Sequence, residues 1–173
     1  MNLAATPLSR VQQAEYANPE HAAAIVSLLD AYARDPMGGG HPLSDFARAH
    51  LVSALAARPQ AFSVLAFGSI AGDQPLQPIG LVNCFEGFST FACQPLVNVH
   101  DVVVLPAYRG RQVAEKMLDL VTEIARERGA CKLTLEVLQG NRAAVKLYER
   151  VGFSHYQLDP AMGQAQFFQM WLS

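Results

Sequence analysis

VVVLPAYRGRQVA, residues 102–114, is the stretch of this sequence that indicates the fold most directly. Its apolar first half predicts a buried strand, and Gly110 marks a tight turn that opens an amphipathic helix. The first amides of a helix have no intrahelical partner, and the helix dipole adds positive potential there. Arg109 and Arg111 add formal charge. The stretch therefore predicts a phosphate-binding turn, with an ordinary turn carrying two solvated arginines as the alternative.

The helix that follows is predicted over 110–128, and Gly129 predicts its end. Five apolar side chains recur on one face of it: Val113, Met117, Leu120, Val121 and Ile124. Strands are predicted before it, at 96–104, and after it, at 132–138. A strand–helix–strand unit of this kind places its two strands parallel and side by side.

Cap residues and apolar periodicity predict the other elements. Asn18 and Ser44 each predict the start of a helix, because both residue types are preferred caps. The elements are a strand at 10–17, helices at 19–33 and between Ser44 and Pro59, strands at 62–67 and 79–88, a helix at 141–151, and a final strand pair at 155–158 and 167–172. We therefore predict an α/β (α+β) fold in a single domain, 1–173: a mixed, mostly antiparallel central sheet with helices on both faces and one central parallel strand pair.

Composition narrows the class of protein. Of 173 residues, 51% are hydrophobic and 16% charged, which is typical of a globular domain. A net charge of -2 argues against nucleic-acid and anionic-membrane partners. Residues 1–10 lack the pattern of a signal peptide, and no apolar stretch is long enough to span a bilayer. Three cysteines without metal-type spacing indicate reduced thiols, so we expect a cytoplasmic protein without a metal.

Two motifs carry a resemblance to a known family. Residues 109–114 resemble the acyl-CoA-binding motif of the GNAT superfamily of N-acyltransferases: Arg or Gln, two residues, Gly, one residue, then Gly or Ala. Arg109 and Ala114 fill its ends, whereas Gln112 stands in place of the middle glycine. The stretch NRAAVKLYERVGF, residues 141–153, resembles the family's second motif. The resemblance covers 79–168 and implies a GNAT-like fold.

The resemblance implies acetyl-CoA as cosubstrate, with its pyrophosphate at 109–114 and its pantetheine arm between splayed strands at 99–104 and 132–138. The cofactor-binding residues it implies are Val102, Val104, Arg109, Gly110, Arg111, Gln112, Val113, Ala114, Asn141, Ala144 and Tyr148. Gln favours helices, so we expect the Gln112 side chain to point to solvent at the helix start. Asn141 is also a candidate helix cap.

The same resemblance implies direct acetyl transfer to an amine. The amine must lose a proton, the oxyanion must be stabilised, and the departing thiolate must gain a proton. Tyr148 matches the family's acid, and Asp101, His100 and Glu86 are candidates for the base. Side chains alternate along a strand, so His100 and Asp101 should face opposite sides unless a bulge intervenes. Each candidate also has a structural interpretation. Asp101 is then a hydrogen-bonded structural carboxylate, His100 a packing or surface residue, and Glu86 a solvated side chain.

The acceptor is expected between residues 35–42 and the strands 79–88 and 96–101. Its polar candidates suit a cationic amine of a small molecule or peptide, and they are Asp35, His41, Glu86, His100 and Asp101. The run Gly38–Gly40 predicts a mobile loop able to close over this site.

Two rival functions stay open at this point. One is a non-catalytic acyl-CoA-binding module that acts as a sensor or partner-binding domain. The other is a nucleotide-binding domain, disfavoured because the sequence has neither a Walker lysine nor G-x-G-x-x-G. The sequence leaves the oligomeric state open, with a homodimer among the alternatives.

Overall fold

The structure is a computed structural model that describes residues 8–69, 75–156, 159, 161, 163 and 165–172. The chain forms two compact units, residues 1–135 and 136–173. The single domain expected from the sequence stays a prediction.

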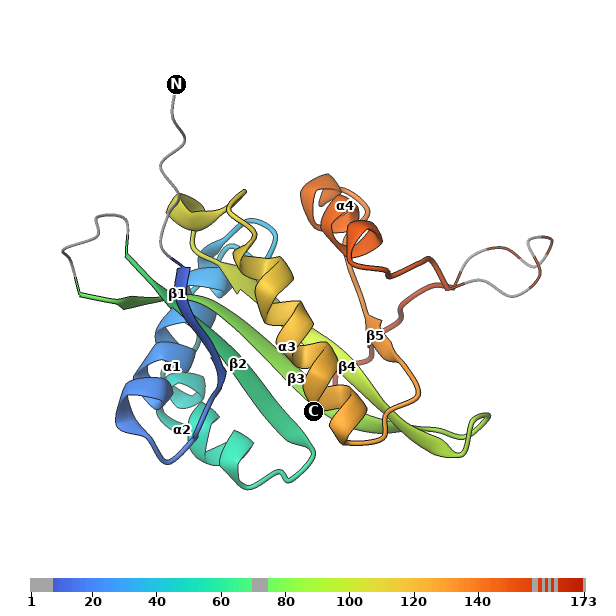
Figure 1. Ribbon diagram of the computed structural model, residues 1–173, viewed down its shortest axis with the longest axis horizontal. Helices are drawn as coiled ribbons and strands as arrows, with labels where there is room; N and C mark the ends of the chain where they lie inside the picture. Colours follow the sequence, from blue (N-terminus) through green and yellow to red (C-terminus); the bar gives the residue numbers. More distant parts are fainter. Residues whose placement is uncertain are drawn as a thin grey trace. The chain divides into compact units, whose positions relative to one another are not determined.

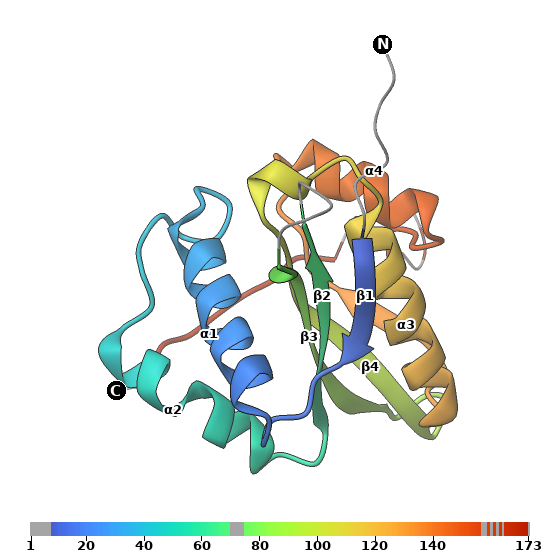
Figure 2. The same cartoon turned by 60° about the vertical axis from the view of Figure 1, so that its left-hand side comes forward.

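The first unit contains a five-stranded sheet with the order β1-β2-β3-β4-β5. The strands are β1 (Leu8–Gln13), β2 (Ala61–Gly68), β3 (Gln77–Ser89), β4 (Gln94–Val104) and β5 (Leu133–Leu135). All neighbours pair antiparallel except β4 and β5, which are parallel. Helices α1 (Pro19–Arg34) and α2 (Asp45–Ala56) lie on one face and α3 (Val113–Glu127) on the other, as Figures 1 and 2 show. The predicted mixed sheet is confirmed.

Each face of the sheet has its own core. Leu65 and Phe67 of β2 join Ile25 and Leu28 of α1 in one buried cluster. Because side chains alternate along a strand, neighbouring β2 residues face α3 instead. There the helix comes close to the sheet: a Cβ added to Gly80 would lie 2.8 Å from Cε of Met117. Burial on both faces explains why β2, apart from Ser63, is apolar at successive positions rather than alternating.

The predicted helix caps are confirmed. Oδ1 of Asn18 accepts hydrogen bonds from the amides of Glu20 and His21, and Oγ of Ser44 accepts one from Ala47. Gly129 follows α3 with a φ of 73°, the left-handed conformation that glycine adopts without strain. These local signals therefore predicted the starts of α1 and α2 and the end of α3.

The C-terminal strand prediction is wrong where the structure tests it. Residues 155–156 and 167–172 form no strand, while 157–158 lie outside the described residues. The parallel pair β4–β5 consequently lies at one edge of the described sheet rather than at its centre. An apolar run becomes a strand only when a neighbour accepts its backbone hydrogen bonds, and the sequence pattern does not supply that neighbour.

The segment after α1 folds into a tight turn. The amides of Gly38 and Gly40 donate to the carbonyl of Asp35, and the amide of His41 donates to Ala33. A Cβ on Gly38 would lie 2.0 Å from the carbonyl oxygen of Tyr32, so only glycine fits there. The glycine run that suggested mobility thus permits close approach to the end of α1.

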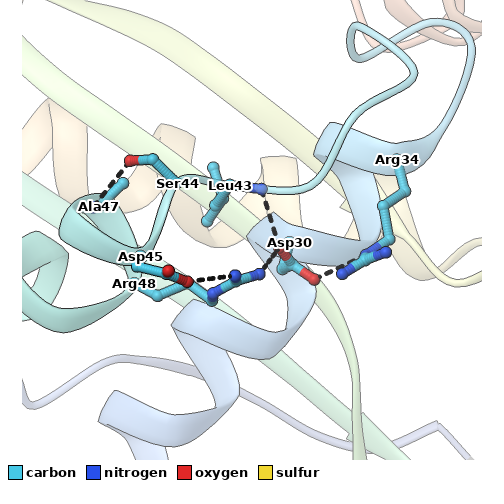
Figure 3. A network of polar contacts seen from close by, with 7 residues as sticks. All are labelled: Asp30, Arg34, Leu43, Ser44, Asp45, Ala47 and Arg48. Atoms are coloured by element: carbon cyan, nitrogen blue, oxygen red, sulfur yellow. Dashed lines mark hydrogen bonds and ion pairs between the residues drawn. The ribbon is translucent and has the colours of Figure 1, made fainter.

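Asp30 joins this turn to both helices (Figure 3). Its carboxylate accepts from Nε of Arg34 at 2.8 Å, from Nη1 of Arg48 at 3.1 Å and from the amide of Leu43 at 2.9 Å. Arg48 also donates to Asp45 at 2.7 Å. The hydrogen bond from Arg34 is the main reason that the pKa of Asp30 lies below its ordinary value. One carboxylate therefore links α1, the turn and α2.

This network predicts a pH-dependent loss in Asp30→Asn. Because the folded pKa is lowered, the carboxylate stabilises the fold above its unfolded pKa of about 3.9. That stabilisation is lost as pH falls through the lower folded value. The variant should therefore melt below wild type at pH 7, and the difference should shrink below about pH 4. Asp45→Asn is the control, because Asp45 contacts Arg48 from a side chain that is 99% exposed. Equal melting of Asp30→Asn and wild type at pH 7 would contradict the prediction.

Candidate functional site

The turn between β4 and α3 has an unusual backbone. A short 3-10 helix (Pro106–Tyr108) follows β4, and α3 begins at Val113 rather than at Gly110. Gln112 is the N-cap of α3, with φ 62° and ψ 14°, and its exposed side chain makes no capping hydrogen bond. The expectation that Gln112 belongs to the helix is wrong, although its side chain is exposed as expected. The backbone at this position adopts the left-handed conformation. The glycine that usually stands here in the motif adopts that conformation without strain.

Gln112→Gly should therefore stabilise the protein. The left-handed conformation costs a residue with a Cβ about 1–2 kcal/mol. Glycine avoids this cost, but it loses more conformational entropy on folding, which destabilises the folded state by about 0.5–1 kcal/mol. We expect a net gain of between about 0 and about 1.5 kcal/mol in the free energy of unfolding, measured with urea. Gln112→Ala is the matched control, since it keeps the Cβ and should give little gain. If both variants gained equally, the strain argument would fail.

The same turn has room and donors for a phosphate. A Cβ on Gly110, whose φ is 74°, would meet no atom within 4 Å, so its outer side is open to a ligand. The first amides of α3, at Val113 and Ala114, lack intrahelical acceptors as in any helix, and no side chain caps them at Gln112. Arg111 is exposed beside them. The residues therefore fit the pyrophosphate that the motif implies.

Arg109 is engaged within the protein itself. Its Nη2 donates to Oδ2 of Asp35 at 2.8 Å and its Nε to the carbonyl of Val104 at 3.0 Å. The other oxygen of Asp35 accepts from the amide of Met37. The Arg109 hydrogen bond is the main cause that lowers the pKa of Asp35. Arg109 thus ties the turn between β4 and α3 to the turn after α1, and the Val104 carbonyl is already engaged by Arg109.

The parallel pairing of β4 and β5 is short. It joins Val97 to Leu133, Asn98 to Thr134 and Val99 to Leu135. Beyond Val99, within the described residues, β4 pairs only with β3, as Val102 does with Val82. The predicted neighbours are therefore confirmed, and their ladder ends before Val102 and Val104. An edge of a strand whose backbone groups are not paired with a neighbouring strand can pair with an extended ligand.

A β-bulge interrupts β4 at His100. Asp101 pairs with Asn83 and Val99 with Cys84, so His100 has no partner in this register. The His100 ring meets the Phe85 ring edge-on at 5.4 Å, and Phe85 packs against the core cluster on the α1 face. Asp101 precedes Val103 of the same cluster by two positions. The bulge therefore brings His100 and Asp101 to the same face, against the simple alternation that would separate them.

Asp101 ends a chain of buried hydrogen bonds. Nδ2 of Asn83 donates to Oδ2 of Asp101 at 2.9 Å, and Oγ of Ser63 donates to Oδ1 of Asn83 at 2.7 Å. The hydroxyl of Tyr16 lies 3.0 Å from Oγ of Ser63. Sequence reasoning missed Tyr16, Ser63 and Asn83. The signal available was a single polar residue inside each of two otherwise apolar buried strands, AFSVLAF and GLVNCF.

Glu86 lies on the opposite face from Asp101. It follows Phe85 by one position, and its carboxylate pairs with Nη1 of Arg128 at 3.3 Å. The Arg128 guanidinium also stacks over the ring of Phe62, at 4.6 Å from its centre. The structure therefore brings together two of the three base candidates and separates Glu86 from them. Of the other acceptor candidates, Asp35 is bonded to Arg109, and His41 is exposed.

The second unit contains helix α4 (Arg142–Arg150). Asn141 caps it, with Oδ1 accepting from the amide of Ala144 at 3.2 Å, so the capping interpretation is confirmed. The half-buried positions include Asn141, Ala144 and Tyr148, which share one face of the helix as predicted. The Tyr148 ring meets the Phe153 ring at 5.8 Å, and the amide of Phe153 donates to the Tyr148 carbonyl.

Two classes of site are missing from the part of the chain that the structure describes. Within it, no group of three or more His, Cys, Asp or Glu side chains is arranged to hold a metal ion. Nor does any helix there have the length and apolar character needed to cross a membrane.

The first unit is a mixed α/β fold whose strand–helix junction has the room and the donors to fit a phosphate, and comparison with known proteins identifies its family. The model of the acetyltransferase (GNAT) family matches residues 26–153, most of the chain. The protein therefore belongs to the acetyltransferase (GNAT) family. Streptothricin acetyltransferase of Streptomyces lavendulae is 35% identical over 80 residues, which cover 46% of this chain and 42% of that protein. The chain thus matches less than half the length of this curated relative.

Solved structures agree on the fold. A probable acetyltransferase aligns with a TM-score of 0.75 at 21% identity, covering 95% of this chain and 99% of the other. The aminoglycoside N-acetyltransferase AAC(6')-Iy in complex with CoA aligns with a TM-score of 0.67 at 18% identity, covering 93% of each chain. At these identities the likeness establishes the fold and no more.

Proposed function

We propose that this protein transfers the acetyl group of acetyl-CoA to an amine by direct attack in a ternary complex. Family membership and the phosphate-binding turn support the use of acetyl-CoA. The observation that carries the proposal is the placement of Asp101. It lies beside the bulge in β4, just beyond the point where pairing with β5 ends, at the end of a buried hydrogen-bond chain.

Several groups would hold the cosubstrate. The amides at 110–114 and the charge of Arg111 would bind the pyrophosphate, and Val102 would offer its backbone to the pantetheine arm. Asn141, Ala144 and Tyr148, which lie on the half-buried face of α4, would also contact the cosubstrate. Acetyl-CoA supplies the activated thioester carbonyl. The remaining chemistry concerns two protons, which the chain's own side chains must move.

The protonated amine first gives a proton to Asp101, which frees the nitrogen lone pair. The nitrogen then attacks the thioester carbonyl, so that the new N–C bond forms, the C–S bond breaks and the second proton on nitrogen passes to solvent. Asp101 releases its proton to solvent afterwards. Tyr148 gives its phenolic proton to the departing sulfur and regains one from solvent afterwards, so charge and protons balance. His100 is the second candidate for the base, because the bulge brings it to the face that Asp101 occupies and its ring is exposed.

We infer a cationic amine acceptor, of a small molecule or a peptide. Tyr32 supports this: its pKa is raised mainly by burial and further by the negative charges of Asp101 and Asp35. The Asp35 charge is paired with Arg109, so the charge of Asp101 is the one that attracts a cation, and the rings of Phe85 and His100 offer it contact area. The relative that is 35% identical over 80 residues is named for streptothricin, which favours the small molecule. Free Cys84, Cys93 and Cys131 agree with a cytoplasmic setting.

Turnover with a panel of amines tests the proposal. Purified protein is mixed with acetyl-CoA and with streptothricin, aminoglycosides, simple alkylamines or peptides. Free thiol and the mass of the acetylated product are both measured. We expect thiol release that depends on the amine. Binding of acetyl-CoA by calorimetry without turnover on any amine would favour the non-catalytic acyl-CoA-binding module instead. Absence of binding would overturn both.

A further inference from the structure

The hydrogen-bond chain under Asp101 crosses the sheet. It starts at Tyr16, after β1, and passes through Ser63 of β2 and Asn83 of β3 to Asp101 of β4. Ser63 is 0% exposed and Asn83 2% exposed, while Tyr16 and Asp101 are half-buried. Buried polar groups cost free energy unless they are bonded, and apolar residues of similar shape would serve packing equally well. The chain therefore calls for an explanation beyond stability.

The charge of Asp101 sets the direction of every bond in the chain. A carboxylate only accepts, so the Asn83 amide must turn Nδ2 toward it and Oδ1 toward Ser63. The single hydroxyl proton of Ser63 then goes to Asn83. Ser63 must in turn accept from Tyr16. Burial is the main reason that the pKa of Tyr16 is raised, so the phenol keeps the proton that it donates.

The same geometry distinguishes the two carboxylate oxygens. Oδ2 of Asp101 accepts from Asn83, so Oδ1 is the oxygen available to an incoming proton. A protonated carboxyl with its proton on Oδ1 still accepts at Oδ2. The chain from Tyr16 to Asp101 thus remains intact in both protonation states. Proton transfer needs no rearrangement of the residues beneath it.

We propose that Asn83 is the positioning residue for the base Asp101, with Ser63 and Tyr16 fixing the orientation of the Asn83 amide. The inference rests on the proposed acetyl transfer and deepens it. In the step concerned, the N–H bond of the amine breaks and an O–H bond forms at Oδ1 of Asp101. Asn83 holds the carboxylate plane through Oδ2 while this happens.

Asn83→Leu tests the inference, because leucine has a similar size and no donor. With an alkylamine, which is protonated at the assay pH, kcat/KM should fall about 10- to 10²-fold, the scale of a misplaced catalytic group. With methoxyamine, which is neutral at pH 7 and so has no ammonium proton to lose before attack, the loss should be much smaller. The affinity for acetyl-CoA should not change. Equal losses with both acceptors would point to a merely structural role and overturn the inference.

A double-mutant cycle sharpens the test. If Asn83 acts through Asp101, then adding Asn83→Leu to Asp101→Asn should cost nothing further. Additive losses would overturn the inference. Tyr16→Phe, which removes the far end of the chain and keeps the ring, should give a smaller loss with the alkylamine and again almost none with methoxyamine. If Asn83→Leu does not fold, Tyr16→Phe tests the same hydrogen-bond chain. Unchanged kinetics in Tyr16→Phe would then count against the inference.

The outcomes separate this inference from the proposed function. If the wild-type protein acetylates no amine, the proposed function fails. If it does, and Asp101→Asn is as fast as wild type, the assignment of the base fails. If Asp101→Asn is slow while Asn83→Leu matches wild type with the alkylamine, only the positioning role of Asn83 fails.

Discussion

Asp101→Asn is expected to lower kcat/KM for amine acetylation by about 10²-fold or more, the usual scale for the loss of a general base. Asparagine has the same shape, and its amide oxygen can still accept the hydrogen bond from Asn83. What disappears is the negative charge and the ability to take a proton. Stability and acetyl-CoA affinity should therefore stay close to wild type. Initial rates of thiol release, together with calorimetry for acetyl-CoA, provide the measurement.

Two control variants locate the effect. Glu86→Gln should leave turnover nearly unchanged, because Glu86 pairs with Arg128 on the opposite face of the sheet. His100→Ala tests the second candidate on the same face as Asp101. Should His100→Ala lose the activity while Asp101→Asn keeps it, the base is His100. Full activity in both variants would mean that water takes the proton.

Tyr148→Phe is the second change from which we expect a large effect, a fall in kcat of about 10²-fold. The departing thiol has a reference pKa of about 8.5 and a phenol about 10. A phenol therefore keeps its proton at neutral pH, yet donates it to a sulfur that is gaining negative charge. Phenylalanine retains the ring that meets Phe153 at 5.8 Å, so the local packing of α4 should survive. Acetyl-CoA affinity should not change.

Tyr156→Phe is the matched control for this prediction. Tyr156 belongs to the same unit, and 62% of it is exposed. Removing its hydroxyl should not alter kcat. Full turnover in Tyr148→Phe would show that another group protonates the sulfur. A fall in acetyl-CoA affinity equal to the fall in rate would instead mean that the Tyr148 hydroxyl binds the cosubstrate and does not act as the acid.

Local signals in the sequence determined most of the elements and the family. The caps Asn18, Ser44 and Asn141 were predicted because a short polar side chain reaches the amides two or three residues on, whatever the rest of the chain does. The apolar face of α3 follows from spacing within a single helix. The turn at 109–114 was identified in the same way, since strand, glycine and helix are contiguous there.

Only the tertiary structure decided how the site is assembled. The bulge at His100 depends on the register between β3 and β4, and that register is set by pairing along both strands. The bond between Arg109 and Asp35 joins residues that lie far apart in the sequence, as does the chain from Tyr16 to Asp101. The apolar run at 167–172 shows the converse, because a strand pattern without a bonded neighbour forms no strand. Caps and periodicity act over a few residues, whereas registers and long-range contacts exist only once distant segments meet.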